Sequence, residues 1–208
     1  MRLIQSKEKM TMKSIYLVLD MQNDLVHPDG ASGKSPLGEQ VRSREVIART
    51  AAAIAKARAK GIPVAYVRVA FSDDHREANP NSQVFGPIAK NGILKASAWG
   101  GAVHEALAPQ PQDWDIVKHR VSPFYATRLE LLLRREGIER IYCSGVSTQA
   151  VVQATVRDAH DRDFDVVVLE DCCASPSAQE HTNSMGSIAR FCTSVSTEAA
   201  FEDCAALL

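Results

Sequence analysis

The sequence predicts an α/β protein, with a three-layer α/β/α domain around a central, mostly parallel, Rossmann-like sheet of about six strands. Short apolar runs alternate with longer amphipathic segments, which is the pattern of a parallel sheet covered by helices on both faces. A chain of 208 residues is long enough for one hydrophobic core and does not require a second. We therefore expect an N-terminal tail over residues 1–13 and a single domain over residues 14–208.

The elements follow from the hydrophobic periodicity. Strands are expected over residues 15–19, 64–69, 115–117, 140–144, 164–169 and 193–196. Helices are expected over residues 40–59, 102–107, 127–136, 149–162 and 178–191. Gly61 and Gly137 each follow a helical pattern directly, where a left-handed residue commonly ends a helix. Residues 71–95 are rich in Asp, Asn, Pro and Gly, so we expect a loop that serves as a lid or binding element.

Composition and charge favour a small-molecule substrate as the partner. A net charge of -1 with a pI near 6.6 gives no electrostatic reason for binding nucleic acid or a membrane. Residues 1–13 are polar and mildly basic, and the apolar segment of a secretory signal does not follow them, so we expect a cytoplasmic protein. An odd number of cysteines without metal-type spacing fits reduced, mostly buried thiols. These cysteines are Cys143, Cys172, Cys173, Cys192 and Cys204.

Polar residues follow three of the predicted strands directly. Ligands of a doubly wound sheet bind outside the carboxyl ends of its strands, so these residues are the candidates for chemistry. Asp20 closes the first run and Lys118 closes the third. The turn from Gly145 to Thr148 closes the fourth run and opens a helix.

Each candidate has a chemical role and a structural alternative. Desolvation would raise the pKa of Asp20 and suit it to acid or base catalysis, whereas a nearby Lys118 would lower that pKa again. Lys118 would also orient Asp20 and offer positive charge to an anionic substrate or oxyanion. Backbone amides at this turn, including those of Ser147 and Val151, would bind an anion or a carbonyl oxygen. The alternatives are a turn-capping Asp20, a solvated Lys118 and a Thr148 that merely caps the next helix.

Four stretches, taken in order, resemble the isochorismatase-like cysteine hydrolases, a group that includes nicotinamidases, carbamoylsarcosine amidases and isochorismatases. They are Leu-Asp-Met-Gln-Asn-Asp from Leu19, Lys-His-Arg-Val-Ser-Pro-Phe from Lys118, Gly-Val-Ser-Thr from Gly145 with Ala-Thr-Val-Arg-Asp-Ala following from Ala154, and Leu-Glu-Asp-Cys-Cys-Ala-Ser from Leu169. The resemblance covers residues 15–200. It implies a cis peptide bond between Val146 and Ser147, and a homodimer or homotetramer with the 71–95 loop near a subunit contact.

In the amidase members of this family, an Asp, a Lys and a Cys form the catalytic triad. The resemblance gives the first two roles to Asp20 and Lys118, and the Cys position, six residues after Gly145, is occupied by Val151. A valine has no lone pair to attack a carbonyl, so the thioester route is closed. Isochorismatases also lack the Cys, and their Asp protonates a vinyl ether without a covalent intermediate. Their turn reads Gly-Val-Tyr-Ala-His-Ile-Gly, unlike this chain, so isochorismate itself is not the expected substrate.

The resemblance also suggests which residues contact the substrate: Asn23, Phe124, Val146 and Ser147. Nicotinamidases hold a metal with an Asp and several His near the loop after the second strand. Here that region offers only Asp73, Asp74 and His75, without a second histidine. Because a divalent site needs three or more convergent ligands, neither a metal nor another cofactor is expected.

The neighbours of these candidates are expected to be structural. His119 and Arg120 adjoin Lys118 without a chemical role, and Cys172 and Cys173 belong to the core and do not replace the missing nucleophile.

The sequence thus favours a hydrolase or lyase-like enzyme that acts on a small anionic or amide-bearing metabolite, with water as the nucleophile. The alternative is a non-catalytic relative that binds a small ligand or serves in assembly, and Val151 is the main evidence for it. Asp20 and Lys118 favour the enzyme, because a pocket released from chemistry has no reason to keep a charged pair that costs several kcal/mol to desolvate.

Overall fold

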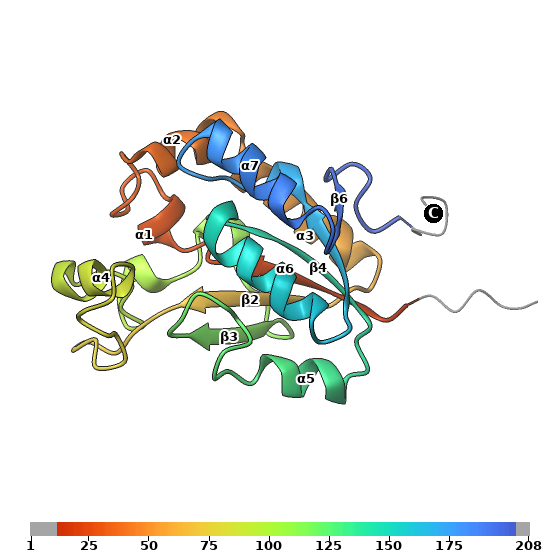
Figure 1. Ribbon diagram of the computed structural model, residues 1–208, viewed down its shortest axis with the longest axis horizontal. Coiled ribbons are helices and arrows are strands. Elements are labelled where there is room, and N and C mark those ends of the chain that lie inside the picture. Colours follow the sequence, from red (N-terminus) through yellow and green to blue (C-terminus); the bar gives the residue numbers. More distant parts are fainter. Residues whose placement is uncertain (1–11, 203–208) are drawn as a thin grey trace, which may run out of the picture.

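The computed structural model describes residues 12–202, and six parallel strands form one sheet in the order β3-β2-β1-β4-β5-β6 (Figure 1). The strands are β1 (Ser14–Leu19), β2 (Val64–Val69), β3 (Trp114–Lys118), β4 (Arg140–Gly145), β5 (Asp165–Leu169) and β6 (Thr193–Val195). Each lies within one residue of its predicted bounds. The predicted three-layer α/β/α class is confirmed, and all pairings between these strands are parallel.

Helices cover both faces of the sheet because side chains along each strand alternate between two cores. They are α1 (Asn23–Val26), α2 (Pro36–Ser43), α3 (Val46–Ala59), α4 (Phe85–Asn91), α5 (Leu129–Arg135), α6 (Gln153–His160) and α7 (Ala178–Ile188). In β1, Ile15 and Leu17 pack with α5 and α6, whereas Tyr16 and Val18 pack with α2 and α3. The strands run toward the side where α1 and α4 lie, and both ends of the described part of the chain lie on the opposite side (Figure 1).

The single helix expected over residues 40–59 is wrong. The chain forms α2 and α3 with a break at Arg44 and Glu45, where Glu45 takes a left-handed φ of 55°. The cause is tertiary, because the Arg44 guanidinium turns away to donate to the carboxylate of Glu170 (2.7 Å) and the carbonyl of Cys173 (3.0 Å). Helical periodicity carries no information about that contact.

Three other segments also differ from expectation. The helix expected over residues 102–107 is wrong, because only the 3₁₀ turn η2 (Glu105–Leu107) forms there, preceded by another, η1 (Trp99–Gly101). The helix expected over residues 149–162 begins with a π-helical turn, η3 (Thr148–Val152). The expected loop over residues 71–95 contains α4. The two glycine stops are confirmed, since Gly61 and Gly137 have φ of 69° and 64°.

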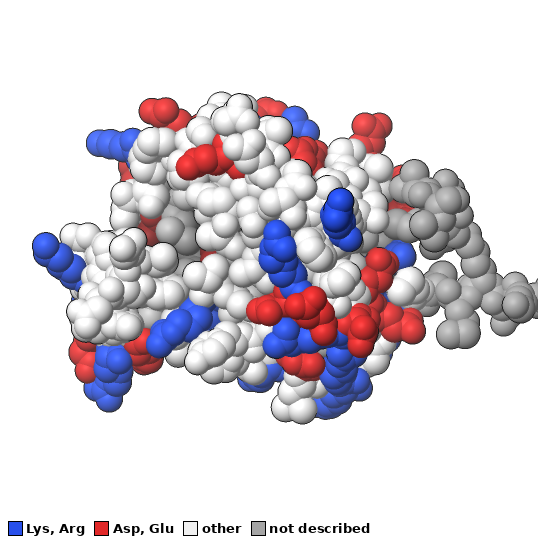
Figure 2. All heavy atoms as spheres, in the orientation of Figure 1, with Lys and Arg blue, Asp and Glu red and all other residues white. Residues whose placement is uncertain are grey.

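The expected tail over residues 1–13 lies mostly outside the described residues. Of its last residues, Lys13 already belongs to the domain, because its carbonyl accepts the Glu139 N–H at 2.8 Å. Acidic and basic side chains are intermixed on the face shown in Figure 2, in keeping with the small net charge. Within residues 12–202, a helix long and apolar enough to cross a membrane does not occur.

Candidate active site

Asp20 and Lys118 form a buried ion pair across the ends of β1 and β3. Asp20 follows β1 with a left-handed φ of 56°, and the side chains of Asp20 and Lys118 are only 7% and 2% exposed. Lys118 Nζ donates to Asp20 Oδ2 at 2.9 Å and to the carbonyls of Arg120 (3.1 Å) and Val121 (3.0 Å). All three ammonium protons are therefore used, and the ammonium is fixed in one position. The solvated alternative for Lys118 is wrong.

The second carboxylate oxygen of Asp20 has a different environment. Asp20 Oδ1 is buried and lacks a hydrogen-bond partner among residues 12–202. Burial raises the pKa of Asp20, and the charge and hydrogen bond of Lys118 oppose that rise, with a smaller effect from the nearby backbone N–H of Val69. That N–H makes its hydrogen bond to Gln22 Oε1 at 2.9 Å and not to Asp20. A buried acceptor without a partner costs free energy, so a water or ligand atom is the partner to expect there.

A small cavity of about 160 Å³ lies against this pair. Its lining is apolar apart from Asp20, Lys118 and Ser147. The lining residues are Asp20, Leu25, Leu37, Val69, Val84, Phe85, Ile88, Leu94, Lys118, Val121, Val146, Ser147, Ala150 and Val151. Such walls lower the local dielectric and strengthen the field of the ion pair.

The turn after β4 brings polar backbone to this cavity. The peptide bond between Val146 and Ser147 is cis, as the resemblance implied. Gly145 is required before it, because a Cβ at that position would lie 2.1 Å from the Leu19 carbonyl oxygen. Ser147 lines the cavity, and its hydroxyl has no hydrogen-bond partner among the described residues. Thr148 is not the N-cap of the next helix, because that position falls to Ser147.

Val151 lines the same cavity from η3 and is 2% exposed. None of the cysteines within residues 12–202 lines it. Those four thiols are free, and Cys143, Cys172 and Cys173 are fully buried, as expected of core residues. Burial raises the pKa of Cys172 to about 12 and that of Cys192 to about 11, so these thiols stay protonated near neutral pH.

Two residues expected to bind substrate lie outside the cavity lining. Asn23 donates from Nδ2 to the Trp99 carbonyl at 2.8 Å, which fastens α1 to η1. Phe124 packs in the core, with its ring 6.3 Å from that of Phe164 and the Arg162 guanidinium 4.8 Å above it. Both make structural contacts, whereas Val146 and Ser147 do line the cavity.

The segment 71–95 contributes four residues to the cavity lining: Val84, Phe85, Ile88 and Leu94. Phe85 and Ile88 belong to α4. Sequence reasoning missed this helix, although Val84, Phe85 and Ile88 repeat at helical spacing. Its binding-element role was expected, whereas its helical form was not.

Asp73, Asp74 and His75 of the same segment each contact a different residue and do not converge on a common metal site. Asp74 pairs with Arg76 at 2.7 Å, Asp73 accepts the Ser97 hydroxyl, and His75 Nε2 lies 2.7 Å from the Ile93 carbonyl. The neighbours of Lys118, which we expect to be structural, hydrogen-bond to the protein backbone. His119 Nδ1 lies 2.8 Å from the Ala70 carbonyl, and Arg120 donates to the Glu77 carbonyl at 2.9 Å.

A network of buried hydrogen bonds connects η3 to α7 and to Glu170. His181 Nε2 lies 2.5 Å from Glu170 Oε1, and His181 Nδ1 lies 2.8 Å from the Thr148 hydroxyl. Because the carboxylate holds the proton on Nε2, Nδ1 accepts the hydroxyl proton. Arg44 completes the network on Glu170. Sequence reasoning missed it, since its members lie far apart in the chain.

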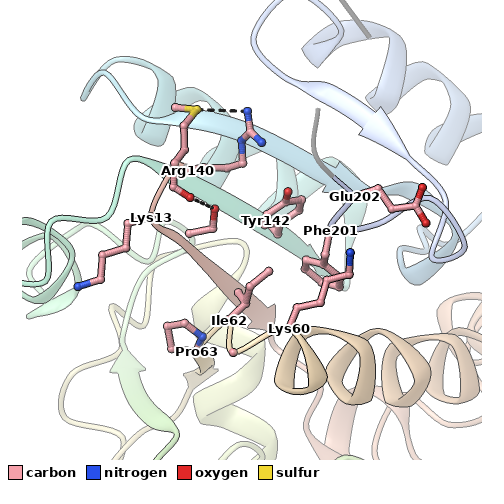
Figure 3. Close-up of a pocket in the computed structure, with 11 residues that line it drawn as sticks. Lys13, Lys60, Ile62, Pro63, Arg140, Tyr142, Phe201 and Glu202 are labelled. Atoms are coloured by element: carbon pink, nitrogen blue, oxygen red, sulfur yellow. Dashed lines mark hydrogen bonds between the residues drawn. The ribbon is translucent and has the colours of Figure 1, made fainter. Parts of the chain in front are cut away.

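A second cavity, of about 440 Å³, lies at the opposite ends of the strands from the Asp20 cavity. Figure 3 shows its lining. Lys13, Lys60, Arg140 and Glu202 surround the rings of Tyr142 and Phe201 there. Met12 and Glu202, the first and last described residues, both line it. It lies away from the carboxyl ends of the strands, where the Asp20 cavity opens.

The fold and site define a doubly wound α/β protein with a cavity at the carboxyl ends of the strands of its parallel sheet, where such folds bind ligands. Residues 14–199 match the isochorismatase domain, and the chain belongs to the isochorismatase family of hydrolases.

Relatives of known name support this assignment. The chain is 39% identical to the isochorismatase family protein YecD of Escherichia coli O157:H7 over 144 residues, which cover 69% of this chain and 74% of YecD. It is 32% identical to the ureidoacrylate amidohydrolase RutB of Methylobacterium radiotolerans over 202 residues, covering 91% of this chain and 78% of RutB. A crystal structure of an isochorismatase family protein from Desulfovibrio vulgaris matches with a TM-score of 0.80 and 28% identity, covering 90% and 96% of the two chains.

Proposed function

We propose that the chain hydrolyses a small amide-bearing or anionic metabolite, with Asp20 as acid or base and water as the nucleophile. The observation that carries this proposal is the unpartnered Asp20 Oδ1, a buried carboxylate oxygen beside one that Lys118 fixes at 2.9 Å. Such an oxygen can take a proton from an attacking water or give one to a leaving group. The backbone amide and hydroxyl of Ser147 would stabilise the oxyanion.

We assign Val151 to the position at which the amidases of this family have their Cys. The alignment of the Gly145 turn and the presence of Val151 in the cavity lining support this assignment. Without a thiol, water adds to the carbonyl directly, the C–N bond then breaks as the leaving amine takes up a proton, and an acyl-enzyme intermediate is not formed.

The substrate class follows from the site and the relatives. A cavity of about 160 Å³ suits a small metabolite, and Lys118 suits one that carries or develops negative charge. The name of the RutB relatives, ureidoacrylate amidohydrolase, supports an amide as the bond that is cleaved. The free thiols support a cytoplasmic location.

The test is a screen of the full chain against small amides, carboxylates and enol ethers, read by product release and by thermal shift. We expect release of an amine, ammonia or acid from at least one amide. If compounds raise the melting temperature but none is turned over, the alternative function, a non-catalytic ligand-binding or assembly module, replaces this one. Val151 is the observation that favours that alternative.

A further inference from the structure

Two histidines and a glutamate meet on the surface beside α1, outside the lining of the Asp20 cavity. One ring nitrogen from His27, one from His104 and a carboxylate oxygen of Glu105 all lie within 4.8 Å of one another. His27 Nε2 is 3.5 Å from Glu105 Oε1, and His104 Nδ1 is 3.9 Å from Glu105 Oε2. Tetrahedral zinc, with bonds of about 2.0–2.1 Å, separates its ligand atoms by about 3.3 Å, so small side-chain shifts would suffice.

The backbone holds these donors together before any ion arrives. His27 ends α1, and His104 precedes η2, far along the chain. The His104 N–H donates to the Met21 carbonyl at 2.9 Å, and the Asn23 N–H donates to the Ala102 carbonyl at 2.9 Å. The rings of His27 and His104 pack with centroids 5.1 Å apart. The backbone therefore places the two imidazoles and the carboxylate side by side.

Metal binding would replace one hydrogen bond of each histidine. His104 Nδ1 has its lone pair in the ring plane, where it now accepts the Ala106 N–H at 3.2 Å, and a metal ion would take the place of that N–H. His27 Nδ1 accepts the Asp29 N–H at 3.1 Å, which leaves the proton on Nε2. For Nε2 to bind a metal, that proton moves to Nδ1, where Asp29 Oδ2 lies 3.8 Å away as an acceptor. A carboxylate behind a ligating histidine is a common second layer of zinc sites.

We propose that His27 Nε2, His104 Nδ1 and the Glu105 carboxylate bind a divalent transition-metal ion of the zinc type, with water as the fourth ligand. Two imidazoles favour such an ion over magnesium or calcium, which prefer oxygen ligands alone. The ion would fasten the segment after β1, which gives Leu25 to the Asp20 cavity, to the segment before β3. It is a structural site and is independent of the hydrolytic mechanism.

The experiment is a titration of the untagged, chelator-treated full chain with Zn²⁺ alone, by calorimetry and by thermal shift. We expect one ion per chain and, at about a hundredfold excess over Kd, a melting temperature raised by about 5 °C or more. His27→Gln, His104→Gln and Glu105→Gln should each weaken binding about tenfold or more. His160→Gln is the matched control, since His160 is exposed and its nearest carboxylate is Asp161; its affinity should equal that of the parent.

Absence of stoichiometric binding would overturn the proposal, as would binding that survives His27→Gln and Glu105→Gln unchanged, since the ion would then sit elsewhere. Equal weakening by His160→Gln would mean adsorption to surface histidines and would overturn it too. Because His104 is buried, the His27 and Glu105 variants carry the test if His104→Gln does not fold.

Discussion

At the residue scale, the two carboxylate oxygens of Asp20 have different surroundings. Lys118 holds one of them, and the other is buried without a partner among the described residues. This difference between the two oxygens is stronger evidence for a functional site than the ion pair itself. An ion pair that served only stability would satisfy both oxygens, because an unsatisfied buried acceptor costs about 1–3 kcal/mol.

Lys118→Met should raise the pH at which Asp20 ionises. The ammonium lowers the pKa of Asp20 by charge and hydrogen bonding, so its loss leaves desolvation unopposed. The pH–rate profile should therefore shift to higher pH, and turnover should fall. Lys90→Met, on the exposed end of α4, is the control and should leave the profile unchanged. A Lys118→Met profile that coincides with that of the parent would contradict the coupling.

Alkylation of thiols should leave activity unchanged. The cavity lining contains no cysteine from the described part of the chain, and burial raises the pKa of Cys172 and Cys192 to about 12 and about 11. Iodoacetamide treatment followed by mass spectrometry and an activity assay checks this. Loss of activity that tracks modification of Cys172 or Cys173 would show that a thiol takes part.

Several site residues could be predicted from sequence because strand ends and family motifs are local. Asp20, Lys118, Ser147 and Val151 meet at one cavity as expected. Asn23 and Phe124 lie outside the cavity lining, because a motif gives the position of a residue and not the direction of its side chain. The unpartnered oxygen of Asp20 depends on tertiary packing, which the sequence does not display.

At the element scale, the π-helical turn η3 depends on the network behind it. The Thr148 hydroxyl and Glu170 hold His181 between them, so η3, α7 and the turn after β5 are joined by buried hydrogen bonds. The amphipathic period predicted a regular helix here. A π turn depends on contacts between distant residues, so the period could not reveal it.

Thr148→Val should lower the free energy of unfolding by about 1–3 kcal/mol, because the near-isosteric side chain leaves His181 Nδ1 buried without a donor. Urea denaturation measures the change. Thr182→Val, an exposed substitution on α7, is the matched control and should change stability by less than about 0.5 kcal/mol. Equal effects of the two variants would mean that the network adds nothing specific.

The division of residues 40–59 into α2 and α3 has the same kind of cause. The chain leaves the helical conformation at Glu45, beside Arg44, whose side chain reaches Glu170 far along the chain. Strand bounds were predicted to within one residue because alternation and apolar runs are local properties. Helix breaks were missed where a distant partner decides them.

At the scale of the whole molecule, we expect a homodimer or homotetramer. Val84 and Trp99 are 55% and 52% exposed although both are large and apolar, and Val84 belongs to the 71–95 segment that the family resemblance assigns to a subunit contact. Light scattering after size exclusion should give two or four times the 22.7 kDa of one chain. Val84→Lys should reduce that mass, whereas Leu131→Lys on α5 should not. A monomeric parent would contradict the expectation.

Protonation of Asp20 also links the site to global stability. Because the folded-state pKa is raised, the contribution of Asp20 to stability is fully present below its unfolded pKa and is lost as the pH rises through the folded pKa. Asp20→Asn should remove this loss of stability at higher pH, because Asn carries no charge. It also strands the Lys118 ammonium, which would cost a few kcal/mol unless another partner replaces the carboxylate.

The turnover of Asp20→Asn on an identified substrate tests the central claim most directly. The substitution keeps size and hydrogen bonding but removes proton transfer, so turnover should fall about 10²-fold or more while the fold survives. Asp161→Asn, exposed beyond the end of α6, should match the parent. Turnover by Asp20→Asn within threefold of the parent would contradict the assignment of Asp20 as the working acid or base.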